Sequence, residues 1–219
     1  MKSLTTYIAE KMIFNKSTAT NYNYHPKSKA ELQKIIIDRI KEEGNELDLN
    51  DIDTSALTDL SYLFDNTISE LFADFNGNIS KWDVSNVTDI KYCFGFCKKF
   101  NGDLSGWNLS EAEDISFMFK NCYEFQGKGL ENWNISKAET ARGMFMNCKK
   151  FNSNISKWDP KNIIDSCYMF DGCSHFNQDL SNWNMQSIYR EVDHEDMFYA
   201  CPLENNKQKQ PKFIYEINN

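Results

Sequence analysis

Apolar and polar residues change their spacing within each stretch of about 25 residues. In 104–109, the apolar residues Leu104, Trp107 and Leu109 are separated by small or polar residues, which predicts a short extended strand. The next apolar residues follow at steps of 3, 1 and 3, which predicts a short helical segment. They are Ile115, Met118, Phe119 and Cys122.

The same pattern recurs along most of the chain. The tryptophans mark it at intervals of 25 or 26 residues: Trp82, Trp107, Trp133, Trp158 and Trp183. A Phe-x-x-Cys motif follows each of them, ending at Cys97, Cys122, Cys148, Cys173 and Cys201. Repeats of this length stack on one another, because one unit cannot bury its apolar face alone. The sequence therefore predicts a solenoid of five to six short strand–helix repeats.

The N-terminal part predicts a cap for this solenoid. Residues 1–25 show no clear periodicity and are expected to be an irregular lead-in. In 26–46, Ser28 and Glu31 form a capping box, an apolar stripe follows at helical spacing, and Gly44 gives a stop. We expect an amphipathic helix over 29–43 that covers the apolar end of the first repeat.

The solenoid itself is expected to span 47–201. Its first repeat, 47–80, is degenerate and has Ile52 where the other repeats have tryptophan. The last repeat is longer and more charged, as terminal repeats usually are. Residues 202–219 are expected to form a C-terminal cap with a capping strand at 213–217.

Charge and hydropathy limit the classes of partner. The 219-residue chain has a formal net charge of −8 and a pI of about 5.0, which argues against direct nucleic-acid binding and leaves room for a basic protein partner. No apolar run approaches the roughly 18 residues that a membrane-spanning helix needs, and no signal-peptide core follows Lys2. We expect a cytoplasmic protein, or a cell-surface protein if an export signal has been removed.

The seven cysteines predict a buried ladder of thiols. Five of them share one repeat position, whereas a zinc site needs two close Cys or His pairs and a disulfide framework usually has an even count. Cys93 and Cys167 lie off this ladder. We expect no metal and no cofactor.

Three strings carry a family resemblance: ISKWDVSNVTD (79–89), CKKFNGDLSGWN (97–108) and MFDGCSHFNQDLSNWN (169–184). They resemble the repeat of the BspA-like, leucine-rich-repeat-type family, which is abundant in bacterial surface lipoproteins. The resemblance covers about residues 47–201. It implies an α/β leucine-rich-repeat-type solenoid used for adhesion or protein binding, with no enzymatic activity attached to the repeat.

Candidate binding residues are those that flank the tryptophans, because the tryptophans themselves are expected to fill the core. Varying residues precede or follow each ring: Lys81, Asp83, Asn108, Asn132, Asn134, Lys157, Asp159, Asn182 and Asn184. Those after the tryptophans can either satisfy turn N–H groups or face a partner. Aromatic residues outside the core pattern are further candidate anchors, Tyr123 and Tyr189 first among them, with Phe96, Tyr168 and Tyr199.

The sequence lacks a phosphate loop, a metalloprotease motif and a nucleophile elbow. We therefore predict a non-enzymatic, monomeric protein-binding module that uses one face of a solenoid. One version is an inhibitor of a basic nucleic-acid-handling protein, such as a nuclease or CRISPR effector from phage or bacterium. The alternative is a bacterial surface adhesin that binds host or extracellular proteins.

Overall fold

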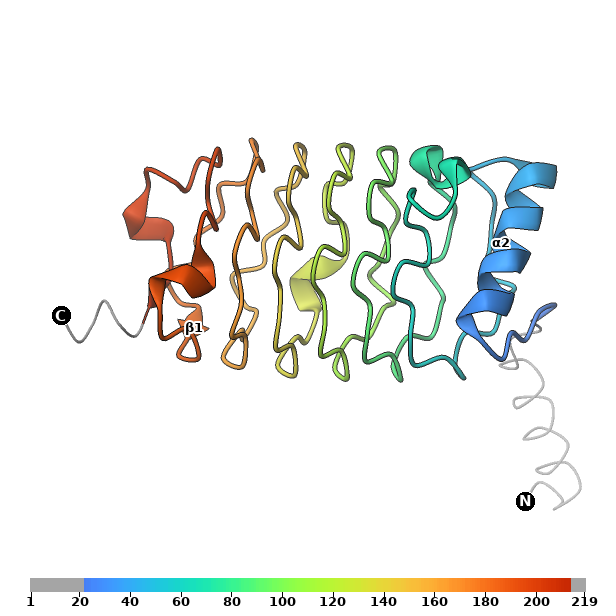
Figure 1. Cartoon of the computed structure of the whole chain (residues 1–219), viewed down its shortest axis with the longest axis horizontal. Coiled ribbons are helices and arrows are strands. Elements are labelled where there is room, and N and C mark those ends of the chain that lie inside the picture. Colours follow the sequence, from blue (N-terminus) through green and yellow to red (C-terminus); the bar gives the residue numbers. More distant parts are fainter. Residues whose placement is uncertain (1–21, 214–219) are drawn as a thin grey trace, which may run out of the picture.

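The computed structural model describes residues 22–213 as a row of similar coils lying side by side (Figure 1). Each coil is one circuit of the chain, and we number the coils 1 to 6 from their first residues, 48, 78, 103, 129, 154 and 179. Parallel single-residue bridges join neighbouring coils, as between Asp89 and Asp114. Helix α2 lies at one end of the row and strand β1 near the other (Figure 1).

Helix α2 spans Lys29–Glu43, the range predicted from its capping signals. The Ser28 side chain accepts the Glu31 N–H at 3.2 Å, and the Glu31 carboxylate accepts the Lys27 N–H at 2.8 Å. At the other end Gly44 has φ 89°, and its N–H donates to the Ile40 carbonyl. The buried side chains of α2 pack into the same core as the coils.

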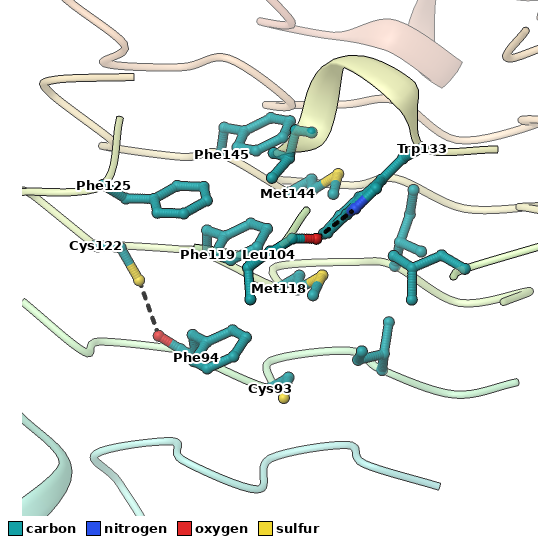
Figure 2. Packing of buried hydrophobic residues seen from close by; sticks show 14 of the residues in the cluster. Cys93, Phe94, Leu104, Met118, Phe119, Cys122, Phe125, Trp133, Met144 and Phe145 are labelled. Atoms are coloured by element: carbon teal, nitrogen blue, oxygen red, sulfur yellow. Dashed lines mark hydrogen bonds between the residues drawn. The ribbon is translucent and has the colours of Figure 1, made fainter. Parts of the chain in front are cut away.

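The core is a set of ladders in which each coil supplies the same side chain. Phe64 of coil 1 and the phenylalanines of the five Phe-x-x-Cys motifs stack with ring centroids 5.3 to 5.7 Å apart from coil 1 to coil 6. Figure 2 shows this packing around Phe119, with Phe94 in the coil before it and Phe145 in the coil after it. Offset aromatic stacking adds to the large apolar burial of each ring.

Residues 47–183 of the described chain contain neither an α-helix nor a named strand, so the local structure of the coils differs from the strand–helix units that the spacing predicts. The segment expected to be helical carries the main hydrogen bonds between coils instead. In coil 3, alternate N–H groups donate to coil 4: Ile115 to Thr140, Phe117 to Arg142, Phe119 to Met144 and Asn121 to Met146. We call this side of the coils, 59–66 in coil 1 to 193–200 in coil 6, the ladder face.

Backbone conformation explains why the segment with helical spacing is not an α-helix. Phe117 and Asn121 have φ 55° and 61°, and the equivalent residues of the other coils are also left-handed, apart from Asn66 in coil 1. A left-handed residue every fourth position cannot belong to an α-helix. The steps of 3, 1 and 3 still place Ile115, Met118, Phe119 and Cys122 in the interior, so the apolar pattern resembles that of a helix.

Turns shape the corners of every coil. A carboxylate or amide side chain at a corner repeatedly accepts the N–H of the residue two positions later, as Asp103 does for Ser105 and Asp114 for Ser116, both at 2.9 Å. These are Asx turns, which fix a corner without a glycine. Two short 3-10 helices interrupt the coils, η1 (Glu70–Asp74) and η2 (Leu130–Asn132).

The C-terminal end closes two sides of coil 6. Strand β1 (Asn184–Met185) pairs in parallel with β2 (Lys212–Phe213), and the Leu180 N–H donates to the Lys209 carbonyl. Helices η3 (Glu191–His194) and η4 (Lys207–Lys209) are single 3-10 turns. Strand β2 begins where the capping strand was expected. Residues 214–217 of that strand, and 1–21 of the predicted lead-in, lie outside the described residues.

Candidate protein-binding surface

The five tryptophans lie in the interior and are tied to the preceding coil. Their exposed fractions run from 1% at Trp82 to 5% at Trp133. Each indole N–H donates to a backbone carbonyl, as Trp133 does to Leu104 at 3.2 Å (Figure 2) and Trp158 to Leu130 at 2.8 Å. The prediction that these rings fill the core is confirmed, and no indole offers a free face to a sugar or nucleobase.

The residues that flank the tryptophans are exposed, and several of them shape turns. Lys81, Asn132, Lys157 and Asn182 precede the rings and are all exposed. Asp83, Asn108 and Asn134 follow the rings and accept the N–H two residues later at 3.0, 3.1 and 3.0 Å. Asp159 pairs with Lys161 at 2.9 Å, and Asn184 lies in β1. This row is open to solvent, but three of its nine side chains accept backbone N–H groups.

The two tyrosines named with that row lie apart from it in the chain. Tyr123 follows the buried Cys122, is half-buried, and has the Lys149 ammonium 5.1 Å from its ring centre. Tyr189 lies in the long segment of coil 6 and is 65% exposed.

The ladder face carries a row of aromatic rings at one repeat position. Tyr62, Tyr92 and Phe117 occupy one position in coils 1 to 3, and Tyr168 has this position in coil 5. Tyr62 stacks on Tyr92 at 5.0 Å, and Tyr92 stacks on Phe117 at 4.6 Å. Tyr62 is exposed and the others are half-buried. We call these four residues the aromatic strip.

The strip exposes ring edges more than ring faces. The faces of Tyr62, Tyr92 and Phe117 are turned toward one another in the stack, and the guanidinium of Arg142 lies 5.1 Å from the ring centre of Tyr168. A sugar or base that binds by stacking needs a free ring face. A ribbed surface of fixed ring edges suits a protein surface instead, because aromatic anchors lose little entropy when they bind.

Cations lie among these rings. The Lys120 ammonium is 5.1, 5.5 and 5.9 Å from the ring centres of Phe117, Phe96 and Tyr92. Such contacts hold a cation against the negative faces of aromatic rings with modest energy. These contacts hold the Lys120 side chain across the aromatic strip.

Carboxylates form a margin beside the strip. Asp59, Asp89, Asp114 and Asp165 lie three residues before the four rings. Lys91 lies 3.5 Å from Asp89 and 3.8 Å from Asp114, and Asp89 is the main reason that its pKa is raised. Burial raises the pKa of the Tyr92 hydroxyl, so this tyrosine stays neutral at physiological pH.

Gly143 interrupts the strip in coil 4 for a steric reason. Its φ is 56°, and a Cβ there would lie 2.4 Å from Cδ1 and Cε1 of the Phe117 ring. Phe117 cannot move aside freely, because it stacks on Tyr92. The ring of coil 3 thus occupies the space that a side chain of coil 4 would need.

We expect Gly143→Ala to lower the free energy of unfolding by roughly 1–3 kcal/mol, from the left-handed φ and the contact with Phe117. In a Phe117→Asn background the contact is gone, and the cost should fall by about 1 kcal/mol or more. Urea unfolding of the wild type, both single variants and the double variant measures this coupling. Strictly additive effects would contradict the assigned contact.

The described residues offer little reactive chemistry. All seven cysteines are free and buried, and burial raises the pKa of the Cys122, Cys148 and Cys173 thiols well above the usual value. Reactive cysteines need the opposite shift. Among residues 22–213, no group of three or more His, Cys, Asp or Glu side chains is placed to hold a metal ion.

Sequence reasoning missed three of the four strip residues as candidates: Tyr62, Tyr92 and Phe117. A signal was present, because an aromatic residue follows Asp59, Asp89, Asp114 and Asp165 by three positions. In an α-helix this position would lie beside the buried stripe and be taken for part of the core. Only the left-handed backbone turns it outward.

A stack of coils with buried ladders and one aromatic row defines a repeat protein whose distinctive chemistry lies on its surface. The family model described as "Mycoplasma protein of unknown function, DUF285" matches residues 32–144 and 119–212. These matches span most of the chain, which belongs to this family. The comparisons with curated proteins and with solved structures found no match.

Within residues 22–213, no helix is both long and apolar enough to cross a membrane.

Proposed function

We propose that this protein is a non-enzymatic protein-binding module, a leucine-rich-repeat-type solenoid of the BspA-like kind, that acts as a monomer through its aromatic strip. The observation that carries the proposal is the stack of Tyr62, Tyr92 and Phe117 on the ladder face, with rings 5.0 and 4.6 Å apart. Aromatic side chains held in place before binding are typical hot spots of protein interfaces.

The shape of the strip favours a protein over other ligands. Three of its rings stack on one another, and backbone hydrogen bonds to the next coil hold the residues that carry them. Lys120 and Arg142 lie among the rings. Interfaces favour Tyr, Phe and Arg at their centres and polar groups at their rims. The margin of aspartates supplies such a rim on one side.

The experiment compares the wild type with a variant that loses two rings and keeps the backbone. Tyr92→Asn/Phe117→Asn suits this purpose, because asparagine tolerates the left-handed φ of 52° and 55° at these positions. Each immobilised protein captures binders from cell extracts and from extracellular proteins. The control variants are Asn132→Ala and Tyr189→Ala, which alter exposed side chains outside the strip.

We expect the wild type and the two control variants to retain the same partner equally well. The partner should bind the double variant about 30-fold more weakly, because the loss of a hot spot of roughly 2 kcal/mol corresponds to that factor. Circular dichroism should show the same fold in all four proteins. Equal retention of the partner by the double variant would refute the aromatic strip as the binding site. Loss of partner binding by Asn132→Ala would indicate that the binding site lies among the residues that flank the tryptophans.

The salt dependence of the captured complex separates two biological settings. The net charge of −8 favours a basic partner, such as a nuclease or another nucleic-acid-handling enzyme that the protein inhibits. Such a complex should weaken strongly between about 0.15 and 0.5 M salt, because screening reduces electrostatic attraction. A salt-insensitive complex with a host or extracellular protein would support the adhesin alternative.

A further inference from the structure

The ladder face has a direction. On the ladder face, each coil donates backbone N–H groups to carbonyl oxygens of the next coil. Each inner segment therefore accepts hydrogen bonds through its carbonyl oxygens on one side and donates hydrogen bonds through its N–H groups on the other. Coil 5 donates to coil 6 through Ser166, Tyr168, Phe170 and Gly172, all at 2.9 Å. The accepting carbonyls are those of Asp193, Glu195, Met197 and Tyr199.

The donating side of coil 6 is only partly used. By the same register its donors include the N–H groups of Asp196, Phe198 and Ala200. Ala200 donates to the Glu204 carboxylate at 3.0 Å. The N–H groups of Asp196 and Phe198 have no hydrogen-bond partner among residues 22–213. The other two sides of coil 6 are covered by η4 and β2.

A hollow adjoins these two donors. It has a volume of about 180 Å³ and is lined by His194, Asp196, Met197, Phe198, Tyr199, Glu204, Lys207, Gln210 and Phe213. The Phe198 ring stacks on Phe170 at 5.6 Å and is the last ring of its core ladder. Tyr199 is 58% exposed. Backbone donors thus lie next to a hollow that combines apolar side chains with the carboxylates of Asp196 and Glu204. Lys207 also lines it and donates to the Gln210 side chain at 3.2 Å.

We propose that this edge, 195–199 of coil 6, binds an extended segment of a partner protein as the next rung of the ladder. Carbonyl oxygens of the segment accept the N–H groups of Asp196 and Phe198, and an apolar side chain enters the hollow. A Lys or Arg of the segment lies near the carboxylates of Asp196 and Glu204. Strand addition at an open edge is a common mode of peptide recognition.

The hydrogen-bond direction excludes a second copy of this chain as the occupant. Two such edges cannot pair face to face, because each would offer N–H donors to the other. Head-to-tail stacking is also blocked, because the Tyr62 and Leu63 carbonyls of coil 1 already accept the Gln33 side chain of α2. The segment comes from a different protein, and this site is independent of the aromatic strip.

Amide hydrogen exchange of the full chain, followed by NMR, tests the edge. In the free protein, the amides of Asp196 and Phe198 should exchange much faster than that of Phe170, which is bonded to coil 6. If both are as slow as Phe170 in the free chain, the edge is already occupied and the proposal is overturned. This outcome would identify the chain's own terminal segment as the occupant.

The binding probe is a displayed library of random twelve-residue peptides, selected on the full chain. We expect selected peptides to combine an aromatic or aliphatic residue with Lys or Arg, and to slow exchange at Asp196 and Phe198 by at least about tenfold. Asp196→Asn keeps the left-handed φ of 50° and should weaken binding about three- to fivefold.

The matched control is Asp159→Asn, an exposed carboxylate on another coil, which should leave peptide binding unchanged. Tyr92→Asn/Phe117→Asn should also leave peptide binding unchanged. The experiment therefore distinguishes an error in the proposed role of the aromatic strip from an error in the proposed role of the coil 6 edge. Peptides that protect only amides of coils 1 to 3, or no selected peptides at all, would overturn the edge as a binding site.

Discussion

Replacing Trp133 with alanine is expected to lower the free energy of unfolding by roughly 3–5 kcal/mol, as the removal of a large buried aromatic side chain does. The indole is 5% exposed and stacks on Trp158 at 6.3 Å. Its N–H also donates to the Leu104 carbonyl, which the alanine variant leaves buried without that donor. Urea unfolding followed by circular dichroism measures the change.

Two further variants divide this effect. Trp133→Phe keeps a ring and loses the indole N–H, so it should cost less than the alanine variant by the apolar area that the phenyl ring still buries. Asn132→Ala changes the exposed neighbour of the same turn and should remain within about 0.5 kcal/mol of the wild type. A loss under about 1 kcal/mol for Trp133→Ala would contradict the burial of the ring.

The thiol of Cys148 is expected to react with a maleimide or iodoacetamide reagent at least about a thousandfold more slowly in the folded protein than in the unfolded chain. Its sulfur is fully buried and donates to the Phe119 carbonyl at 2.9 Å. Burial is the main cause that raises the pKa of this thiol, with the neighbouring Cys122 second, so the reactive thiolate is scarce as well as inaccessible. Labelling requires opening of the core, which costs on the order of 5 kcal/mol or more.

Peptide mapping by mass spectrometry after timed labelling at pH 8 resolves the seven positions. Cys201 is the internal comparison, because it lies in the last coil, is 5% exposed and makes a longer contact of 3.5 Å with the Phe176 carbonyl. It should react before Cys122 and Cys148. Complete labelling of Cys148 within minutes in the absence of denaturant would refute the buried ladder.

Local signals in the sequence were sufficient for several parts of this protein. The period of 25 or 26 residues places Trp, Phe and Cys at one position of each coil, and identical positions in stacked units share one environment. The burial of the tryptophans and of the cysteine ladder follows from that. Helix α2 was equally predictable, because Ser28, Glu31 and Gly44 act on backbone groups within a few residues of themselves.

The conformation of the ladder face depended on contacts between coils. Apolar residues at steps of 3, 1 and 3 satisfy an α-helix and also a chain with left-handed residues at Phe117 and Asn121. Hydrogen bonds to the neighbouring coil select the second conformation, and a pattern within one repeat contains no information about them. The predicted strand–helix repeat therefore differed from the observed coil.

The arrangement of the surface side chains also depends on the contacts between coils. The sequence by itself determined which side chains repeat, which of them fill the core and where α2 begins and ends, because these depend on spacing and on local capping. Only the tertiary structure placed Tyr62, Tyr92 and Phe117 in one stacked row on the ladder face. It also left the N–H groups of Asp196 and Phe198 at a donating edge, because both features require the position of one coil against the next.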